Sequence, residues 1–245
     1  MRTAVVTGAS GGIGSAIARR LASDGSTIIA GYHSAADRAG RLVADLPGAG
    51  HRAMRISVLE PGSLAGLADH ISSTWGCLDV LVNCAGVTRP VPHNDLDALD
   101  DDLIDHIFAT NWRGPFAAVR ALRGLLENSS GSVVVNVSSI AAVTGQGSNV
   151  AYCASKAALD SMTRSLARAL APRVRVVSVS PGWVLGEYAD RMPAAALESQ
   201  RDATPLGRLA TPEDVAAAVS AAVSHLPFTT GAVIPVDGGR PLGAL

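Results

Sequence analysis

The stretch Thr7-Gly8-Ala9-Ser10-Gly11-Gly12-Ile13-Gly14 decides the fold of this chain. It follows a predicted first strand at residues 2–7 and opens onto an amphipathic segment at residues 13–22 that predicts a helix. The glycines let the backbone approach a ligand closely, and the helix N-terminus offers unpaired N–H groups and the positive end of a dipole. A strand, a glycine-rich turn and a helix in this order predict binding of a dinucleotide pyrophosphate; the alternative is a plain tight turn.

Outward from this turn, short apolar runs alternate with longer helical patterns to the end of the chain. Further strands are predicted at residues 27–32, 53–58, 78–83, 132–138, 175–180 and 232–236. Several are apolar on both faces, which is typical of a parallel sheet covered by helices on each side. The pattern predicts one α/β domain over residues 1–245, a Rossmann-type doubly wound parallel sheet of about seven strands.

Two helix starts and one insertion stand out in the pattern. Ser34 with Asp37, and Thr211-Pro212-Glu213-Asp214, both resemble capping boxes. Residues 183–205 follow a Pro-Gly turn and have weak periodicity. Because ligands in such folds bind beyond the carboxyl ends of the strands, we expect this segment to be a substrate lid; the alternative is a surface insertion.

Composition excludes several classes of function. The chain has 245 residues, 24.9 kDa, a formal net charge of -1 and no basic block, which argues against nucleic-acid partners and against a polybasic membrane anchor. Its apolar runs are too short to span a membrane, and because a strand is predicted from residue 2 we expect no secretory signal. The three cysteines Cys77, Cys84 and Cys153 lack C-x-x-C spacing, so we expect a cytoplasmic protein with no metal site.

The segment that contains Tyr152 and Lys156 carries the main chemical signal. At 100° per residue, both side chains lie close to an apolar stripe of the predicted helix. Of the 20 basic residues Lys156 is the only lysine, which indicates that a compact ammonium is required there. At i and i+4 the two side chains are neighbours, and a positive charge lowers the pKa of a phenol. Tyr152 is therefore predicted to be a proton donor; the alternative is a chance tyrosine beside a snorkelling lysine.

Two further polar positions fall where apolar residues are expected. Asn111 lies in a predicted helical stripe formed by Ile104, Ile107, Phe108, Ala118 and Leu122. Its amide should therefore face the interior and need hydrogen-bond partners. Ser138 and Ser139 end the most apolar strand at the edge where ligands bind. Each is, taken alone, more often a core amide or a turn serine.

Over essentially its whole length the chain resembles a short-chain dehydrogenase/reductase. The motifs are, in order, the glycine turn, Asn83-Cys84-Ala85-Gly86, Asn111, Ser138-Ser139, Tyr152-Cys153-Ala154-Ser155-Lys156, Pro181-Gly182, Thr230-Gly231 and Val236-Asp237-Gly238-Gly239. The resemblance places the family's catalytic tetrad on Asn111, Ser139, Tyr152 and Lys156, where Ser139 is chosen because it lies 13 residues before the tyrosine.

The resemblance implies hydride transfer between a nicotinamide and a carbonyl or alcohol carbon. Tyr152 would donate the proton to the carbonyl oxygen, which Ser139 would hold. Lys156 would bind the nicotinamide ribose and lower the tyrosine pKa, and Asn111 would hold a water that links the lysine to solvent. The implied cofactor contacts are Gly8, Ser10, Gly11, Gly12, Ile13, Gly14, Tyr32, His33, Ser57, Val58, Asn83, Ala85, Gly86, Tyr152, Lys156, Pro181, Gly182 and Val184.

Three positions depart from the family pattern. Cys84 replaces a frequent asparagine, and Ser57 stands where an adenine-binding aspartate is common. Gly186 takes the place of a threonine that often holds the carboxamide, so we expect backbone groups of Val184 to do this.

Cofactor choice depends on the end of the second strand, where an acid would repel a 2′-phosphate. Tyr32 stands there, followed by His33 and Arg38, so NADP(H) is favoured. The arginine expected inside the glycine turn is replaced by Gly11, which keeps NAD(H) open.

The C-terminal half most resembles 3-oxoacyl-carrier-protein reductases, which are usually tetramers. We therefore expect NADPH-dependent reduction of a 3-oxoacyl thioester or another ketone by a homotetramer, with acyl carrier protein as a possible partner. Residues 128–132 lack the positive charge often found in enzymes that dock this acidic carrier, although Arg173 offers part of such a patch. Trp183, Tyr188, Met192 and Val91-Pro92-His93 are expected to shape the substrate pocket.

Two alternatives remain open from the sequence. One is an NAD-dependent sugar, polyol or secondary-alcohol dehydrogenase. The other is a nucleotide-sensing or scaffold protein without turnover, against which the intact Tyr152 and Lys156 argue.

Overall fold

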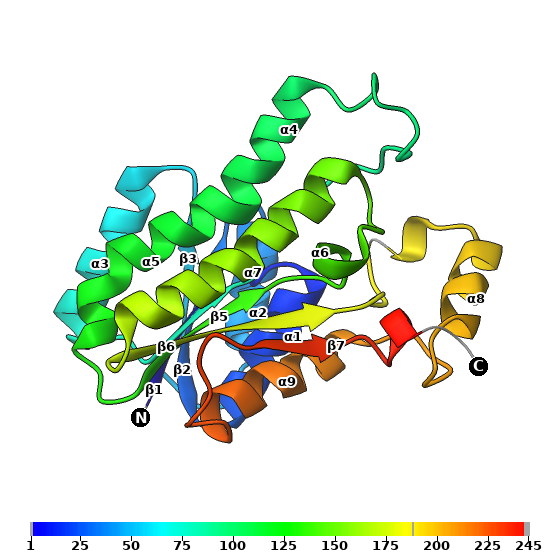
Figure 1. The fold of residues 1–245 in the computed structure, drawn as a ribbon. Helices are drawn as coiled ribbons and strands as arrows, with labels where there is room; N and C mark the ends of the chain where they lie inside the picture. The colour runs from blue at the N-terminus through cyan, green and yellow to red at the C-terminus, as the bar shows by residue number, and fades with distance from the viewer. Residues whose placement is uncertain (1, 188, 243–245) are drawn as a thin grey trace.

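The computed structural model describes residues 2–187 and 189–242, which build one seven-stranded parallel sheet (Figure 1). Its strand order is β3-β2-β1-β4-β5-β6-β7. The strands are β1 (Arg2–Val6), β2 (Ser26–Tyr32), β3 (Arg52–Arg55), β4 (Val80–Asn83), β5 (Ser132–Val137), β6 (Val174–Pro181) and β7 (Val233–Val236). All seven predicted strands are present with bounds shifted by a few residues, and the predicted doubly wound fold is confirmed.

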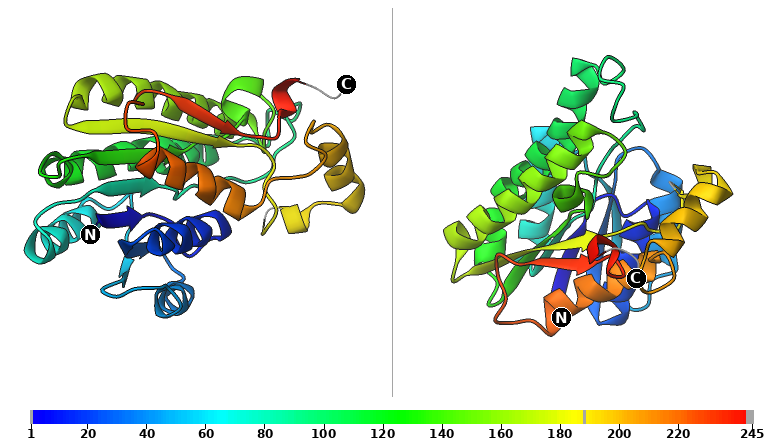
Figure 2. Two further views of the ribbon diagram at one scale, coloured as in Figure 1. Left: turned by 90° about the horizontal axis from the view of Figure 1, so that it is seen from below. Right: turned by 45° about the vertical axis from the view of Figure 1, so that its right-hand side comes forward.

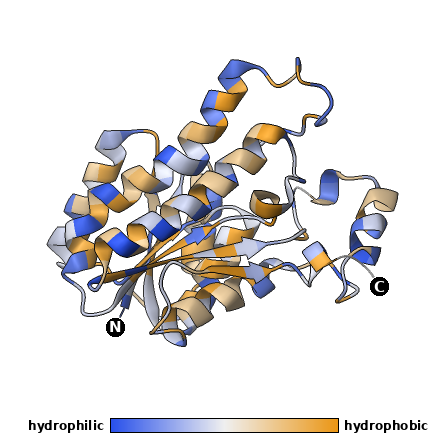
Figure 3. Ribbon diagram, viewed as in Figure 1, coloured by the Kyte–Doolittle hydropathy of each residue, from blue (hydrophilic) through white to orange (hydrophobic). Residues whose placement is uncertain are grey.

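Helices cover both faces of the sheet, as the two orthogonal views show (Figures 1 and 2). The helices α1 (Gly12–Ser23), α2 (Ala36–Ala44) and α9 (Pro212–Ser224) share one apolar core with the sheet. The helices α3 (Pro61–Thr74), α5 (Gly114–Glu127) and α7 (Val150–Leu170) share the other. This explains why the central strands β4 and β5 are buried at every residue and are mainly apolar; Figure 3 shows the hydropathy along the sheet.

The remaining elements lie mostly near the carboxyl ends of the strands. They are α4 (Asp101–Phe108), a π-helical turn (Ala109–Arg113), α6 (Ala141–Thr144), a 3₁₀ turn (Ala189–Arg191), α8 (Ala194–Asp202) and a 3₁₀ turn (Arg240–Leu242). Figure 1 shows α6 and α8 at the end of the molecule toward which the strand arrows point. No helix in the described ranges is long and apolar enough to cross a membrane.

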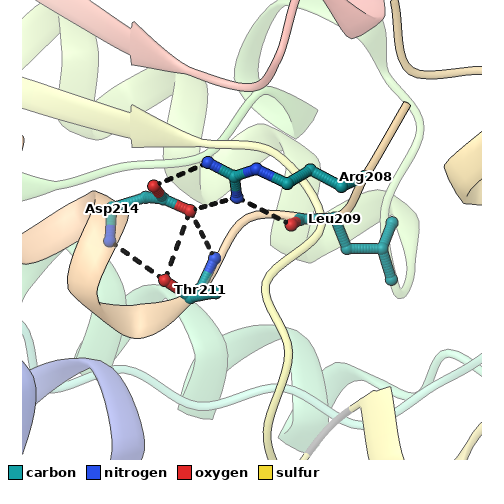
Figure 4. A network of polar contacts seen from close by, with 4 residues as sticks. All are labelled: Arg208, Leu209, Thr211 and Asp214. Atoms are coloured by element: carbon teal, nitrogen blue, oxygen red, sulfur yellow. Dashed lines mark hydrogen bonds and ion pairs between the residues drawn. The ribbon is translucent and has the colours of Figure 1, made fainter. Parts of the chain in front are cut away.

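One predicted capping box is confirmed and the other is wrong. At the start of α9 the Thr211 side chain accepts from Asp214 N, and the Asp214 carboxylate accepts from Thr211 N at 2.7 Å while it also binds Arg208 (Figure 4). At α2 the helix begins at Ala36, so Ala35 occupies the N-cap and makes no side-chain cap bond. The later start removes Ser34 from the cap and leaves Asp37 in the first turn, where it faces the positive end of the helix dipole.

Candidate active site

A cavity of about 670 Å³ opens at the carboxyl ends of the strands. The sheet order reverses between β1 and β4, and ligands in open α/β sheets bind at such a switch point. Its volume lies in the range of cofactor and small-molecule sites. The predicted site residues that line it are Gly8, Ser10, Gly11, Gly12, Ile13, Gly14, His33, Ser57, Val58, Ala85, Gly86, Ser139, Tyr152, Lys156, Pro181, Gly182 and Val184. The structure thus brings together segments from nearly the whole length of the chain.

The glycine turn has the shape that a pyrophosphate requires. Gly8 has a φ of +68°, and a Cβ at Gly14 would lie 2.3 Å from the Gly8 carbonyl oxygen, so this turn folds tightly only with glycine at both positions. A Cβ at Gly12 would meet nothing within 4 Å, since this residue borders the open cavity. The N-cap of α1, Gly11, supplies no side-chain cap. The helix N-terminus is therefore available to an anionic ligand, and the residues fit a dinucleotide.

Thr7 joins this turn to the loop after β4. Its hydroxyl donates to the Val82 carbonyl at 3.3 Å and accepts from the backbone N–H groups of Cys84 and Ala85 at 3.0 and 3.1 Å. The two loops lie so close that a Cβ at Gly8 would be 2.9 Å from Ala85 Cα. The floor of the cavity is therefore fixed by backbone contacts between the two central strands.

Tyr152 and Lys156 project from the first turns of α7. The helix is capped by Asn149, whose Oδ1 accepts from Tyr152 N at 2.7 Å and whose amide donates to the Arg89 carbonyl at 2.8 Å. One turn later, Lys156 Nζ lies 5.7 Å from the centroid of the Tyr152 ring and donates to the Val137 carbonyl at 2.8 Å. The Asn149 cap and the Val137 carbonyl together hold the Tyr152 phenol and the Lys156 ammonium at the cavity wall.

Burial dominates the electrostatics of this pair. Lys156 is only 6% exposed, and burial lowers its pKa to about 8 against the opposing effect of neighbouring Cys84 and Asp160. Burial likewise raises the pKa of the Cys84 thiol to about 11, so the thiol is neutral near pH 7. The ammonium of Lys156 is thus the positive charge beside the Tyr152 ring, and its pKa lies within reach of neutral pH.

Asn111 stands behind the cavity wall instead of lining it. Its Oδ1 accepts from Val87 N at 2.8 Å, and its Nδ2 donates to the Val87 carbonyl at 3.0 Å and to Ser155 Oγ at 3.2 Å. The interior position expected of this amide is therefore present. The prediction that Asn111 lies in one continuous α-helical stripe is wrong. The chain passes from α4 to α5 through the π-helical turn that contains Asn111.

The two serines at the end of β5 differ in their surroundings. Both line the cavity, but Ser138 is 3% exposed and donates to the Lys156 carbonyl at 3.4 Å. Ser139 is half-buried, and its hydroxyl accepts from Ala141 N at 3.2 Å. Ser139 is thus the more open of the two hydroxyls.

Two more of the expected cofactor contacts lie outside the cavity wall. Asn83 is buried and donates to Asn136 Oδ1 at 2.8 Å, so it supports the site from within the sheet. Tyr32 ends β2, and beyond it the wall continues through His33, Ser34, Ala35 and Arg38.

Arg38 spans the mouth of the cavity toward the segment after β6. Its Nη1 forms an ion pair with Glu187 Oε1 at 2.5 Å, and both residues border the cavity. Trp183, Leu185 and Gly186 of the same segment line it as well, whereas Met192 does not and Tyr188 lies outside the described residues. The first part of the segment expected to be a lid, residues 183–187, therefore forms part of the cavity wall.

The expected pocket loop Val91-Pro92-His93 packs against the wall from outside. Val91 N donates to the Ser148 carbonyl at 2.8 Å, and His93 Nε2 lies 3.1 Å from the Gly147 carbonyl oxygen. The wall itself contains residues that the sequence did not single out, among them Thr88, His106, Thr110, Gln146, Gly147 and Ser148. None of them belongs to a motif: His106 lies on α4, Thr110 in the π-helical turn and the others in loops, so their place at the wall depends on tertiary packing.

Within residues 2–187 and 189–242, no three or more His, Cys, Asp or Glu side chains come together in a group that could hold a metal ion.

Comparison with known proteins identifies the relatives of this chain. A family model described as Enoyl-(Acyl carrier protein) reductase matches residues 8–240. A Streptomyces violaceoruber protein named as ketoacyl reductase 2 of the granaticin polyketide synthase is 38% identical over 241 residues, which cover 98% of this chain and 96% of the relative. The cis-4-hydroxycyclohexanecarboxylate dehydrogenase of Sinomonas cyclohexanicum is 38% identical over 244 residues, which cover 97% and 96%.

A solved structure agrees with these sequences. The crystal structure of a protein from Burkholderia xenovorans, described as a short-chain dehydrogenase/reductase, superposes with a TM-score of 0.91 at 35% identity and covers 99% of both chains.

Proposed function

The chain belongs to the short-chain dehydrogenase/reductase family, and from this premise we propose that it reduces a 3-oxoacyl thioester or another ketone with NADPH. Its relatives are oxidoreductases of hydroxyl and keto groups, and the family uses NAD(P)(H). The observation that carries the proposal is the buried Lys156 one turn from Tyr152 at the wall of a cavity whose floor is the glycine turn.

The residues that would hold the cofactor are those of the glycine turn, the loop after β4 and the start of the segment after β6. The N-terminus of α1 would bind the pyrophosphate, because its N–H groups and dipole attract anions. Lys156 would donate to the ribose hydroxyls. A bound nicotinamide would supply the hydride.

Tyr152 is the proposed proton donor for the carbonyl oxygen. Its phenol needs a lowered pKa to exchange a proton near neutral pH, and the ammonium of Lys156 supplies the positive charge that lowers it. Ser139, with the more open hydroxyl at the end of β5, would hold the same carbonyl oxygen. The carbonyl carbon would receive the hydride, and the carbonyl oxygen would receive the phenolic proton of Tyr152, which gives the alcohol.

We assign Asn111 a positioning role within this mechanism. All three of its hydrogen bonds go to Val87 and Ser155, and a Cβ added to Gly86 would lie 3.4 Å from Asn111 Oδ1 and 3.8 Å from Lys156 Nζ. The amide therefore fixes the loop against which Lys156 packs. The water expected from the family resemblance remains a prediction.

NADPH is preferred in this proposal because of the charges at the far end of the cavity. His33 and Arg38 line the wall beyond β2, and no Asp or Glu precedes them on that strand. A 2′-phosphate would meet the guanidinium of Arg38 with no acid on β2 to repel it, and it would take the place of Glu187 in the ion pair with Arg38.

A secondary-alcohol dehydrogenase is the second candidate. The Sinomonas relative is named as a dehydrogenase of a hydroxycyclohexanecarboxylate. The cavity wall carries the hydroxyls of Thr88 and Ser148, which would suit a hydroxylated substrate. The same residues would then act in the oxidative direction, with Tyr152 as the base.

Cofactor titration followed by a turnover assay distinguishes the reductase from the secondary-alcohol dehydrogenase. NADPH and NADH are titrated by fluorescence, and absorbance is then followed with 3-oxoacyl thioesters, ketones and quinones, or with secondary alcohols and polyols and the oxidised cofactors. Tighter binding of NADPH and its oxidation by a thioester or ketone supports the proposal. Turnover confined to alcohols with NAD⁺ favours the second candidate, and failure to bind either nucleotide contradicts both.

Tyr152→Phe provides the matched variant. It removes the phenolic hydroxyl and leaves the ring in place, so we expect turnover to fall by at least about a hundredfold while NADPH still binds. Equal turnover in both proteins would exclude Tyr152 as the proton donor.

A further inference from the structure

A buried carboxyl lies one helical turn beyond Lys156. Asp160, four residues further along α7, is 4% exposed, and Lys156 is 6% exposed. Residues at i and i+4 are neighbours on a helix, and carboxylates are almost never buried without a partner. Oδ1 of Asp160 makes no hydrogen bond within the described residues. A buried acid beside a buried base at an active site calls for an explanation other than packing.

A chain of side-chain hydrogen bonds leads to this carboxyl through the interior of the sheet. Asn83 Nδ2 donates to Asn136 Oδ1 at 2.8 Å, and Asn136 Nδ2 donates to Thr163 Oγ1 at 2.9 Å. Thr163 Oγ1 lies 2.7 Å from Ser178 Oγ, and the Ser178 hydroxyl in turn lowers the pKa of Asp160. An amide donates only through its nitrogen, so the two asparagines fix the direction of the chain. Both of their donors are directed toward Asp160.

The direction of the last two bonds follows from the charge of Asp160. The Leu159 carbonyl lies 3.0 Å from Thr163 Oγ1 and competes for its proton. A carboxylate that accepts from Ser178 selects the arrangement in which Thr163 donates to Ser178. The whole chain is then oriented with its donors toward a negative charge, which it stabilises.

Other groups act on the same carboxyl. Burial raises the pKa of Asp160, while the hydroxyls of Ser138 and Ser178 and the charges of Arg164 and Lys156 oppose this rise. Ser138 also donates to the Lys156 backbone carbonyl at 3.4 Å, so it connects the acid to the turn that carries the base.

We propose that Asp160 is a positioning residue, a buried carboxylate one turn from Lys156 that supplies the counter-charge of the Lys156 ammonium and keeps this ammonium protonated at the cavity wall. The relevance of this residue to catalysis rests on the proposed function. Without the carboxylate, the other acid that acts on Lys156 is the thiol of Cys84, which burial keeps neutral near pH 7. Burial then acts on the ammonium without the opposing charge of this carboxylate.

The single lysine allows a direct test. In protein labelled with ¹³C and ¹⁵N at lysine, the Cε–Hε signal belongs to Lys156 alone, so its titration gives the pKa of this residue without any activity. We expect a midpoint near 8 in the wild type and a midpoint lower by about one pH unit in Asp160→Asn. Asp69→Asn, which removes an exposed carboxylate on α3, should leave the midpoint unchanged. An Asp160→Asn protein that is folded and titrates like the wild type overturns the proposal.

Ser178→Ala keeps the test decisive if Asp160→Asn does not fold. It retains the carboxyl but removes the last donor of the chain, so the midpoint of Lys156 should shift in the same direction by a smaller amount. An unchanged midpoint in Ser178→Ala would then overturn the proposal.

The kinetic consequence is a separate readout. In carbonyl reduction, the pH above which kcat/KM falls should be lower in Asp160→Asn, because loss of a neighbouring negative charge makes the lysine and tyrosine pair easier to deprotonate. If the Lys156 midpoint is lower in Asp160→Asn but the wild type turns over no substrate, the proposed function is contradicted. The role of Asp160 as the counter-charge of Lys156 is then still supported.

Discussion

Lys156 shows at the residue scale why this chain keeps one lysine among 20 basic residues. Its Nζ fits between the Val137 carbonyl and the Tyr152 ring in a pocket that is almost closed to solvent. A guanidinium is larger and planar, and its pKa hardly responds to burial, whereas an ammonium is compact and titrates when it is buried. The site therefore uses the one cation whose charge the protein can tune.

This tuning should reduce the stability of the fold. A pKa lowered from 10.5 to about 8 corresponds to a loss of about 3 kcal/mol in the free energy of unfolding, fully present below pH 8 and relieved as the pH rises toward 10.5. We expect Lys156→Met, which removes the buried charge, to unfold at higher urea concentration than the wild type at pH 7, and this difference to shrink at pH 10. Equal differences at the two pH values would contradict a buried titrating lysine.

Arg38 is the residue on which cofactor choice should depend. Its ion pair with Glu187 is exposed on both sides and is therefore weak, so a 2′-phosphate can replace the carboxylate. We expect Arg38→Ala to weaken NADPH binding by about tenfold and to leave NADH binding unchanged, since only NADPH carries the phosphate.

Glu187→Gln is the control at the other end of this pair. It frees Arg38 without removing it, so NADPH binding should stay equal or become tighter in the same fluorescence titration. Loss of NADPH affinity in Glu187→Gln, or equal losses of both cofactors in Arg38→Ala, would exclude Arg38 as the phosphate ligand.

At the scale of elements, the turn between β1 and α1 explains why the helix can point its N-terminus at the cavity. The Gly14 Cα passes so close to the Gly8 carbonyl that a side chain has no space. The helix therefore starts directly behind the ligand site, and its first turn is packed on the loop after β1.

Gly14→Ala tests this close approach. The added methyl meets backbone atoms that cannot move away, so we expect a loss of about 1–3 kcal/mol or more in the free energy of unfolding, together with weaker cofactor binding. Gly40→Ala, at a position within α2 where a Cβ meets nothing within 4 Å, should instead raise stability by up to about 1 kcal/mol. Similar effects of the two substitutions in urea unfolding would contradict the packing described for the turn.

At the scale of the whole molecule, the cavity joins both halves of the sheet. Its walls come from the loops after β1 and β2 and from α1 on one side, and from β5, α7 and the segment after β6 on the other. A ligand in this cavity would contact elements on both sides, and it is therefore expected to stabilise the folded chain.

Thermal unfolding with NADPH measures this effect. At a concentration one hundred times its dissociation constant, a ligand specific for the folded state contributes about 2.7 kcal/mol, which corresponds to a rise of about 5–10 °C in Tm for a chain of this size. An unchanged Tm up to millimolar NADPH would contradict binding in the cavity.

Local sequence patterns predict the strands, the glycine turn and the pair of Tyr152 and Lys156, because each of these depends on the spacing of residues close together in the chain. Thr211 was recognised as a cap for the same reason. The carboxyl of Asp160 and the pairing of Arg38 with Glu187 could not be predicted, because they depend on which elements meet in space. The π-helical turn at Asn111 was missed because a periodicity of 3.6 residues assumes an unbroken helix.

The central claim is hydride transfer from a nicotinamide to a carbonyl carbon with Tyr152 as proton donor. The most direct measurement uses NADPH carrying deuterium at C4 of the nicotinamide, in each of its two stereoisomeric forms, with the best ketone or thioester of the panel. Mass spectrometry of the alcohol product should show one deuterium on the carbinol carbon from one of the two forms, and Tyr152→Phe should give almost no product. Unlabelled product from both forms, or full turnover by Tyr152→Phe, would contradict the account.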